Sequence, residues 1–402
     1  MPTVLRLSAI LVAAAACSWS AESTSLDPMD AVTFKCLNDK GTVEVADGKV
    51  GKALKFVFAD DSKNAFMVAS TVRGKPEWDQ AAGISFWVKG DGSANCGALQ
   101  FVWNEDYGQR YDCGFSIAST EWTKVVVPWR DLIPVLAKPE CVPLDPKGDH
   151  QPSKLGQAWF GKWWYWNGAY GPHSYTVDDI RLEPTIDLDT KDYKPSSAPL
   201  ARVYAKMKAG KPITVVTMGD SLTDTHHWSN QQTNWPAYFK TGLKDTFKCD
   251  GTIVNPAIGG TELRQNVVMM PRWLSSTPKP DLVTVCFGGN DWNSGMRGAM
   301  FTAALKDAIQ RIRRATKGEA DVLIMTTVPG VETWDTTAEL TEAGRVAAKD
   351  EKAGLCDTGA LFHELGKADK EHLFANDKVH LGQPGQQAIA KAVIEAIEKN
   401  GK

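Results

Sequence analysis

Three side chains in the C-terminal half of this 402-residue chain have the types that ester hydrolysis requires: the hydroxyl of Ser221, the imidazole of His380 and the carboxylate of Asp377. Cleaving an ester near neutral pH takes an activated nucleophile, a base with a pKa near 7 and a group that orients the base. Asp377 precedes His380 by three residues, so their side chains are expected to lie about one turn apart. We therefore predict Ser221 as the nucleophile, His380 as the base and Asp377 as the orienting acid.

Two glycine-containing segments offer hydrogen-bond donors for the charge that develops on the carbonyl oxygen of an ester. One is Gly-Gly-Thr at 259–261, and the other is Gly-Gly-Asn-Asp at 288–291. We predict that the backbone N–H groups of Ser221 and Gly260 and the side-chain amide of Asn290 form an oxyanion hole, with glycine at 260 allowing close approach of the backbone. Each segment alone is common in loops and helix caps, but their joint occurrence in this order favours catalysis.

The elements around these segments have the pattern of a parallel α/β domain. Four continuous apolar or β-branched runs have the character of buried parallel strands; they span 213–218, 252–255, 282–287 and 322–328. Helical spacings lie between them, and the last helix is predicted to begin near Pro384. Repeated β–α units predict a three-layer α/β domain over 212–402. The active site of such a domain lies at the carboxyl ends of its strands.

The catalytic segments, taken together, resemble those of the SGNH (GDSL-type) hydrolase family. Its members carry a nucleophilic Ser, an oxyanion Gly, an oxyanion Asn and an Asp-x-x-His pair, and the resemblance covers about 212–402. It implies a flavodoxin-like parallel sheet and the catalytic roles given above. The chain departs from the family at two places: His-His-Trp at 226–228 replaces an often small residue, and Leu381 replaces a frequent Pro. These departures bear on the shape of the substrate.

The N-terminal part of the chain has a different period. From about 30 to 183, apolar and polar residues alternate in short runs separated by Gly, Asp and Asn, and the final run spans 175–182. This pattern is typical of an antiparallel sandwich, and the strand set resembles galactose-binding-like, carbohydrate-binding jelly rolls. We predict an all-β jelly-roll sandwich over 22–186. A linker with a short helix around 199–208 is predicted over 187–211.

Tryptophan is unusually frequent, with 15 Trp against 14 Phe and 8 Tyr. Nine of them lie between Trp78 and Trp166, and four fall within 159–168. Alternation along a strand would place one face of that cluster in the core and leave the other as a platform on which sugars stack. Core packing is the competing interpretation.

Four side chains near the catalytic segments are candidates for binding the substrate: His226, His227, Trp228 and Trp292. The adjacent histidines raise the question of a metal site. No HExxH motif and no acidic cluster at ligand spacing accompanies them. We therefore predict a substrate contact at this position, with no metal and no cofactor.

Residues 1–21 have the pattern of a secretory signal peptide, with Arg6, an apolar run over 7–16 and small residues near the end. The apolar run is about half the length of a membrane span. Cys17 follows three alanines, so a lipid anchor at this position stays open. We predict a secreted or periplasmic protein without a membrane span.

Export permits disulfides, and seven cysteines follow the leader. Two pairs are candidates for disulfides: Cys96–Cys113 and Cys36–Cys141. Cys286 and Cys356 adjoin apolar runs and are predicted as buried thiols. The odd count leaves at least one cysteine free or paired between chains.

The amino-acid composition excludes some classes of function. The net charge of −3 offers no basic surface for nucleic acid, and 43% apolar with 23% charged residues is typical of a folded protein. We predict a secreted serine esterase that removes acetyl or similar acyl groups from a polysaccharide. A lipolytic or aryl esterase, or a thioesterase, of the same family is one alternative and would have an exposed apolar rim. A non-catalytic glycan-binding protein is the other.

Overall fold

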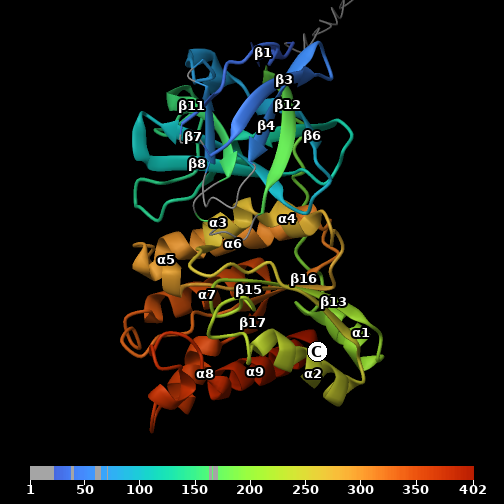
Figure 1. The fold of residues 1–402 in the computed structure, drawn as a ribbon. Helices are drawn as coiled ribbons and strands as arrows, with labels where there is room; N and C mark the ends of the chain where they lie inside the picture. The colour runs from blue at the N-terminus through green and yellow to red at the C-terminus, as the bar shows by residue number, and fades with distance from the viewer. Residues whose placement is uncertain (1–21, 38–39, 59–64, 70, 163–164, 166–170) are drawn as a thin grey trace, which may run out of the picture.

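The computed structural model describes residues 22–37, 40–58, 65–69, 71–162, 165 and 171–402. They form an N-terminal β domain and a C-terminal α/β domain, stacked one on the other in Figure 1. The predicted signal peptide with Cys17 lies outside the described residues, as do three tryptophans of the 159–168 cluster: Trp163, Trp164 and Trp166. None of the helices in the described part of the chain is both long and apolar enough to cross a lipid bilayer.

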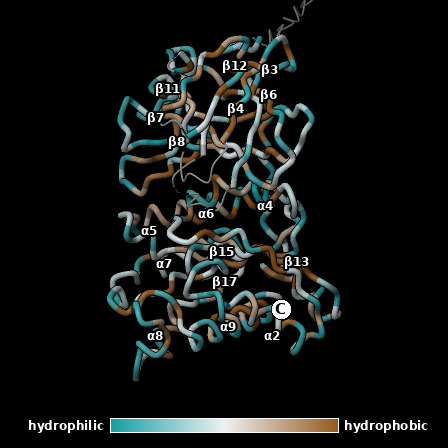
Figure 2. Tube along the Cα trace, in the orientation of Figure 1, coloured by the Kyte–Doolittle hydropathy of each residue, from teal (hydrophilic) through white to brown (hydrophobic). Residues whose placement is uncertain are grey.

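The β domain consists of two antiparallel sheets. The first has the order β3-β4-β12-β6-β9, with β1 beside β12: β1 Thr24–Asp27, β3 Thr42–Asp47, β4 Lys52–Phe58, β6 Gly83–Gly90, β9 Thr123–Pro128 and β12 His173–Glu183. The second has the order β10-β8-β7-β11-β5-β2: β2 Lys35–Cys36, β5 Ala65–Ala69, β7 Cys96–Trp103, β8 Asp106–Ser116, β10 Ile133–Pro134 and β11 Leu155–Lys162. Aromatic rings of both sheets meet between them, as where Phe56 stacks on Phe160 at 5.5 Å, and Figure 2 shows hydrophobic stretches within this domain. The predicted antiparallel β domain is confirmed, while its jelly-roll form stays a prediction.

Strand β7 is buried on both faces, which a sandwich with one solvated face does not require. Leu99 and Phe101 point into the core between the two sheets. Ala98 and Val102, on the opposite face, belong to a buried cluster that includes Ile258 of the α/β domain. The outer face of the second sheet is therefore an interface between the domains.

Both candidate disulfides are wrong, because the structure joins neither Cys96 to Cys113 nor Cys36 to Cys141. Strands β7 and β8 are neighbours, but their register places Cys96 opposite Ser116, three residues from Cys113. Cys36 lies in β2 at one edge of the second sheet, and Cys141 follows β10 at the other edge. Neither pair is close enough in the sheet to be bridged.

The α/β domain is built on five parallel strands in the order β14-β13-β15-β16-β17. Their bounds are β13 Ile213–Gly219, β14 Gly251–Val254, β15 Leu282–Cys286, β16 Asp321–Met325 and β17 Gly354–Cys356. Counted along the chain, the order is second, first, third, fourth, fifth, which is that of flavodoxin-like sheets. The four predicted strands are confirmed. The sequence pattern misses β17, because three residues are too few to show a periodicity.

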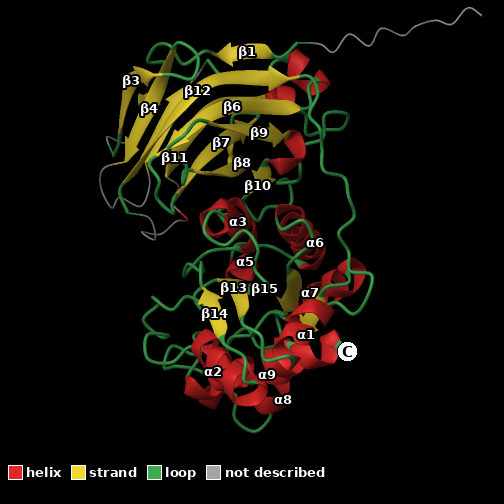
Figure 3. Cartoon of the chain, turned by 90° about the vertical axis from the view of Figure 1, so that its right-hand side faces the viewer, coloured by secondary structure: helices red, strands yellow, loops and turns green. Residues whose placement is uncertain are grey.

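Helices cover both faces of this sheet and complete the predicted three layers (Figures 1 and 3). Facing the β domain are α3 Leu263–Val268, α4 Met270–Leu274, α5 Gly289–Asn293, α6 Gly298–Ala315 and α7 Ala338–Glu351. On the other face are α1 Ala201–Lys208, α2 Trp235–Phe247, α8 Thr358–Leu365 and α9 Gln383–Gly401. Helix α1 is the short helix predicted around 199–208, and α9 begins beside Pro384 as predicted. Cys286 and Cys356 are buried thiols in this second layer, also as predicted.

Residues of the β domain enter the core of the α/β domain. Ile133, Val135 and Ala137, from β10 and the residues after it, belong to the same buried cluster as the apolar faces of α3 and α6. Arg264 of α3 is 8% exposed, and its Nη1 donates to three carbonyl oxygens of the β domain: Pro134 at 3.1 Å, Leu136 at 3.3 Å and Cys141 at 3.2 Å. The β domain therefore supplies part of the core of the α/β domain, beside its own separate core between the two sheets.

Candidate active site

Ser221, His380 and Asp377 are joined by hydrogen bonds. Ser221 lies two residues beyond β13, at the carboxyl edge of the sheet, where folds of this kind place their sites. Its Oγ is 3.0 Å from His380 Nε2, and His380 Nδ1 is 2.5 Å from Asp377 Oδ2. With a proton on Nδ1 donated to Asp377, the Nε2 of His380 is the acceptor for the Ser221 hydroxyl. The arrangement is that of a nucleophile, a base and an orienting acid.

Asp377 and His380 lie in a tight turn rather than on a helix. The Asp377 Oδ1 accepts the N–H groups of Val379 at 3.1 Å and His380 at 3.0 Å. Lys378 between them has a left-handed φ of 61°, and the N–H of Ala375 donates to the carbonyl of His380 at 2.7 Å. Burial acts to raise the pKa of Asp377, but the bonds from the ring and backbone of His380 and from Val379 outweigh it and lower that pKa. Asp377 is therefore held as a carboxylate.

The predicted oxyanion donors converge beside Ser221. Within the described residues, the backbone N–H groups of Ser221 and Gly260 donate to no protein acceptor. The Nδ2 of Asn290 donates to the carbonyl of Thr261 at 3.1 Å and lies 3.4 Å from Asp220 Oδ2. All three donors border the same cleft as the Ser221 hydroxyl. Three residues with predicted hydrogen-bond donors thus surround the cleft into which the Ser221 hydroxyl opens.

Gly260 also meets a backbone requirement that the sequence pattern does not show. A Cβ at Gly260 would meet nothing within 4 Å, but its φ of +77° is left-handed and strains other residues. At Gly259 the protein itself comes close: a Cβ there would lie 3.2 Å from the ring of His227 and 3.5 Å from Ser221 Cβ. Two neighbouring glycines thus serve two separate requirements.

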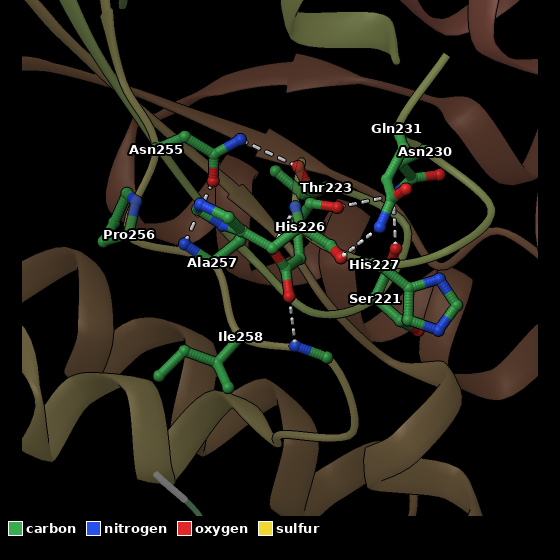
Figure 4. A network of polar contacts seen from close by, with 12 residues as sticks. Ser221, Thr223, His226, His227, Asn230, Gln231, Asn255, Pro256, Ala257 and Ile258 are labelled. Atoms are coloured by element: carbon green, nitrogen blue, oxygen red, sulfur yellow. Dashed lines mark hydrogen bonds and ion pairs between the residues drawn. The ribbon is translucent and has the colours of Figure 1, made fainter. Parts of the chain in front are cut away.

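Polar side chains that sequence reasoning gave no role bind the site loops together (Figure 4). Asn230 Nδ2 donates to the carbonyl oxygens of Ser221 at 2.6 Å and Asp224 at 2.9 Å. Asp224 Oδ2 accepts the N–H of Gly259 at 2.9 Å, which ties the loop after β13 to the loop after β14. Asn255 Nδ2 makes a second tie, to the carbonyl of Thr223 at 2.8 Å. Asn255 ends the strand predicted over 252–255, whereas Asp224 and Asn230 lie outside the segments and strands described above.

Two carboxyl groups are buried behind the site. Burial raises the pKa of Asp220 to about 6 and the pKa of Asp291 to about 8. Asp291 Oδ1 accepts the N–H of Leu263 at 3.0 Å. This bond joins α5 to the first turn of α3, so a protonated Asp291 helps to place the loop that carries Gly260.

The free energy of unfolding is expected to decrease as the pH rises from about 4 to about 8, through Asp291. In the unfolded chain Asp291 ionises near the ordinary value of 3.8, whereas the folded protein keeps the proton to about pH 8. Between these values unfolding releases a proton, so a higher pH favours the unfolded state. Asp291→Asn does not ionise, so its melting temperature should fall less than that of wild type between about pH 6 and pH 8. Parallel melting curves for the two proteins would contradict this account.

His227 packs against the ring of the base. The rings of His227 and His380 stack at 4.2 Å between centroids and 29° between planes, and Trp228 meets His380 edge-on at 5.6 Å. His227 Nδ1 is 2.7 Å from Ser229 Oγ. Burial, and next the charge that His380 can carry, lower the pKa of His227. A neutral His227 thus supports the orientation of His380.

The Ser221 hydroxyl opens into a cleft of ≈ 770 Å³, within the range of about 300–1,000 Å³ typical of small-molecule sites. Its lining includes Ser221, Asp224, His226, His227, Trp228, Asn255, Ala257, Ile258, Gly259, Gly260, Arg272, Asn290 and His380. The predicted substrate contacts at 226–228 are therefore in the cleft. Trp292 does not belong to the described residues that line the cleft. Its ring centroid lies 3.7 Å from the guanidinium carbon of Arg297, and the side chain packs on the core of the α/β domain. Trp292 is a packing residue.

The C-terminal part of the chain is similar to known proteins. Residues 217–388 match the GDSL-like Lipase/Acylhydrolase family. Similar solved structures include the acetylxylan esterase Axe2 from Geobacillus stearothermophilus, at 24% identity over 47% of this chain and 96% of that one, with a TM-score of 0.40. A protein described as a GDSL-like lipase from Parabacteroides merdae has 18% identity over 47% and 96%, and TesA has 23% over 46% and 98%, both with a TM-score of 0.40. No curated protein matches the chain.

Proposed function

We propose, from the premise that residues 217–388 form a domain of the GDSL-like lipase and acylhydrolase family, that this protein is a serine esterase working through an acyl-enzyme on Ser221. The observation that carries the proposal is the unbroken hydrogen-bond chain from Asp377 Oδ2 through the ring of His380 to Ser221 Oγ. Gly260 and Asn290, which carry the proposed oxyanion donors, line the same cleft as Ser221 and support the proposal.

Acylation begins when Ser221 Oγ attacks the carbonyl carbon of the ester and its proton passes to His380 Nε2. The carbonyl oxygen becomes an oxyanion, which the N–H groups of Ser221 and Gly260 and the amide of Asn290 stabilise. The Asp377 carboxylate stabilises the imidazolium. The bond from the carbonyl carbon to the alcohol oxygen then breaks, His380 returns its proton to that oxygen, and the acyl group remains on Ser221.

Deacylation repeats these steps with water. His380 Nε2 takes a proton from a water molecule as its oxygen attacks the acyl carbon. The bond to Ser221 Oγ breaks, Oγ recovers the proton from His380, and the carboxylic acid leaves. The stacked ring of His227 keeps the base aligned for both halves of the reaction.

Replacing Asn290 by alanine is expected to lower kcat on p-nitrophenyl acetate by about 10²–10³-fold, the usual effect of removing one oxyanion donor. The loss should appear in kcat rather than KM, because the oxyanion exists only near the transition state. Asn293→Ala, at an exposed position of the same helix α5, is the control and should keep the wild-type kcat. A wild-type kcat for Asn290→Ala would remove this amide from the mechanism.

The substrate we propose is a polysaccharide that carries acetyl or similar small acyl groups. The cleft walls combine apolar surface with the amide, imidazole and guanidinium groups given above. Trp228 is 60% exposed and presents a flat face beside the base, as sugar stacking requires. A lipolytic enzyme would line this space with a continuous apolar surface instead.

The test compares p-nitrophenyl acetate with p-nitrophenyl octanoate and then measures acetate release from acetylated plant polysaccharides. We expect a higher kcat/KM on acetate and measurable release from at least one polysaccharide. A strong preference for octanoate with no release from any glycan would favour the lipolytic alternative. A folded wild-type protein inert on every ester would favour the glycan-binding alternative.

Export is part of the same proposal. The leader at 1–21 has the signal-peptide pattern given above, so the protein is expected outside the cytoplasm, secreted or in a periplasm. Mass spectrometry of the mature protein tests this. Removal of the leader after Ala21 supports secretion, and an acylated N-terminal Cys17 supports a lipid anchor. An intact leader on the functional protein would contradict both.

A further inference from the structure

Glu262 joins the two segments that carry the predicted oxyanion donors. It lies two residues after Gly260, and its Oε1 accepts the hydroxyl of Ser294 at 2.6 Å. Ser294 directly follows α5, the helix that contains Asn290, and its N–H donates to the Asn290 carbonyl oxygen at 2.9 Å. The hydrogen bond between Glu262 and Ser294 therefore connects one donor segment to the other.

Two further hydrogen bonds run beside this one. The carbonyl oxygen of Thr261 accepts Asn290 Nδ2 at 3.1 Å, and Asp291 Oδ1 accepts the N–H of Leu263 at 3.0 Å. Three consecutive residues, 261–263, are thus each bonded to the segment 290–294. The central bond of the three joins two side chains, so a substitution can remove it without altering a backbone partner.

The carboxyl group of Glu262 is held in a buried position. The residue is 6% exposed, and its backbone N–H donates to Gln265 Oε1 at 3.0 Å in the first turn of α3. Burial raises the pKa of Glu262, and the hydrogen bond from Ser294 opposes this rise. A buried carboxyl group is costly unless hydrogen bonds offset its loss of water. Glu262 is therefore fixed through its backbone by α3 and through its side chain by Ser294.

We propose that Glu262 is a positioning residue for the oxyanion hole: its bond to Ser294 sets the place of the Gly260 N–H relative to the Asn290 amide. This inference rests on the proposed esterase function and adds a residue to the same site. Two donors stabilise an oxyanion together only if both lie within hydrogen-bond distance of one oxygen atom. They belong to different segments, so the contact between the segments controls their separation. Glu262 is not among the described residues that line the cleft, so it acts through the donors.

The test measures kcat and KM on p-nitrophenyl acetate for variants of this contact. Glu262→Ala should lower kcat by about 10- to 100-fold and leave KM unchanged, because a misplaced donor costs less than the about 10²–10³-fold loss of a missing one. Glu262→Gln keeps an oxygen that can accept the Ser294 hydroxyl and should retain most of the wild-type kcat. Ser294→Ala removes the same bond from the side of an exposed residue. It should lower kcat by about 10-fold, since the donors again lose their fixed separation.

Two comparisons separate positioning from a general loss of stability. Glu351→Ala removes a similarly buried glutamate, 4% exposed, which lies on α7 outside the cleft and accepts Gln310 Nε2 at 2.9 Å. It should lower the melting temperature and keep the wild-type kcat. In an Asn290→Ala background, Glu262→Ala should lower kcat by less than about threefold, because a donor that is absent cannot be misplaced.

Each outcome bears on a separate statement. A folded Glu262→Ala protein with wild-type kcat, or a loss in Glu262→Gln as large as that in Glu262→Ala, overturns the inference and leaves the esterase proposal standing. If Glu262→Ala does not fold, Ser294→Ala decides, and a wild-type kcat in that variant overturns the inference. An undiminished loss in the Asn290→Ala background also overturns it, since the two residues then act independently. Failure of the wild type to hydrolyse any ester overturns the esterase proposal and the inference with it.

Discussion

Replacing Ser221 by alanine is expected to lower the turnover of p-nitrophenyl acetate by about 10⁴–10⁶-fold, the usual effect of removing a nucleophile from such a triad. The side chain of Ser221 is partly exposed, and within the described residues its hydroxyl makes one hydrogen bond, to His380 Nε2. The substitution therefore removes no buried group on which the fold depends. Its melting temperature should stay within about 2 °C of wild type, as for most substitutions outside the core.

Ser275→Ala is the matched control, because this serine is exposed and its hydroxyl donates a local hydrogen bond to the carbonyl of Arg272. It should keep wild-type turnover. A folded Ser221→Ala protein with more than about a tenth of wild-type turnover would place the nucleophile elsewhere, since one missing nucleophile costs several orders of magnitude.

The second large effect is on folding: a chain that lacks the β domain, residues 22–186, is expected not to yield a soluble hydrolase. Ile133, Val135 and Ala137 fill part of the core of the α/β domain, and β7 and β8 cover Ile258 and Val268. Removing them exposes this apolar surface to water at about 25 cal/mol for each Å². The same loss leaves the buried guanidinium of Arg264 without its three carbonyl acceptors.

A point substitution tests the same interface in the intact protein. Arg264→Ala should lower the free energy of unfolding by roughly 3 kcal/mol, because it leaves buried carbonyl groups without a donor. Arg297→Ala is the control: this arginine donates to nearby carbonyl groups but its side chain is 50% exposed, so the loss should be small. A shortened chain that is soluble, melts like the full chain and hydrolyses p-nitrophenyl acetate at the wild-type rate would show that the β domain is a separable module.

The interface between the domains also bears on whether the aromatic residues of the β domain pack in a core or form a platform for sugars. Trp159 is 6% exposed and lies in the buried cluster with Ile258 and Met269, so core packing applies to this tryptophan. Asp112 of β8 is fully buried on the same face of this sheet. The hydroxyl of Tyr165 and the amide of Gln100 donate hydrogen bonds to its carboxyl group. Burial raises the pKa of Asp112 to about 7. This sheet face is therefore occupied within the chain, and the sugar-stacking faces we propose are those of the cleft.

Prediction from sequence succeeded where a feature is local. The strands β13–β16 show as continuous apolar runs, and the segments that follow them contain Ser221, Gly260 and Asn290. Strand β17 and the register of Cys96 were missed. A three-residue strand carries no period, and register depends on how two distant runs align, which neither run shows by itself.

The sequence by itself determined the order of the β and α/β domains, the parallel sheet and the segments that contain Ser221, His380 and the predicted donors. Each of these is encoded within a few neighbouring residues, through hydrophobic period or through side-chain type at a strand end. Only the tertiary structure decided that Arg272 enters the cleft, that Asp224 joins two loops, that Trp292 is covered by Arg297 and that the β domain completes the core of the hydrolase. These contacts join residues that lie apart on separate elements or in different domains. They form because folding buries apolar faces against one another and because buried polar groups need hydrogen-bond partners. A single stretch of sequence contains only one partner of such a contact, so it cannot show the contact.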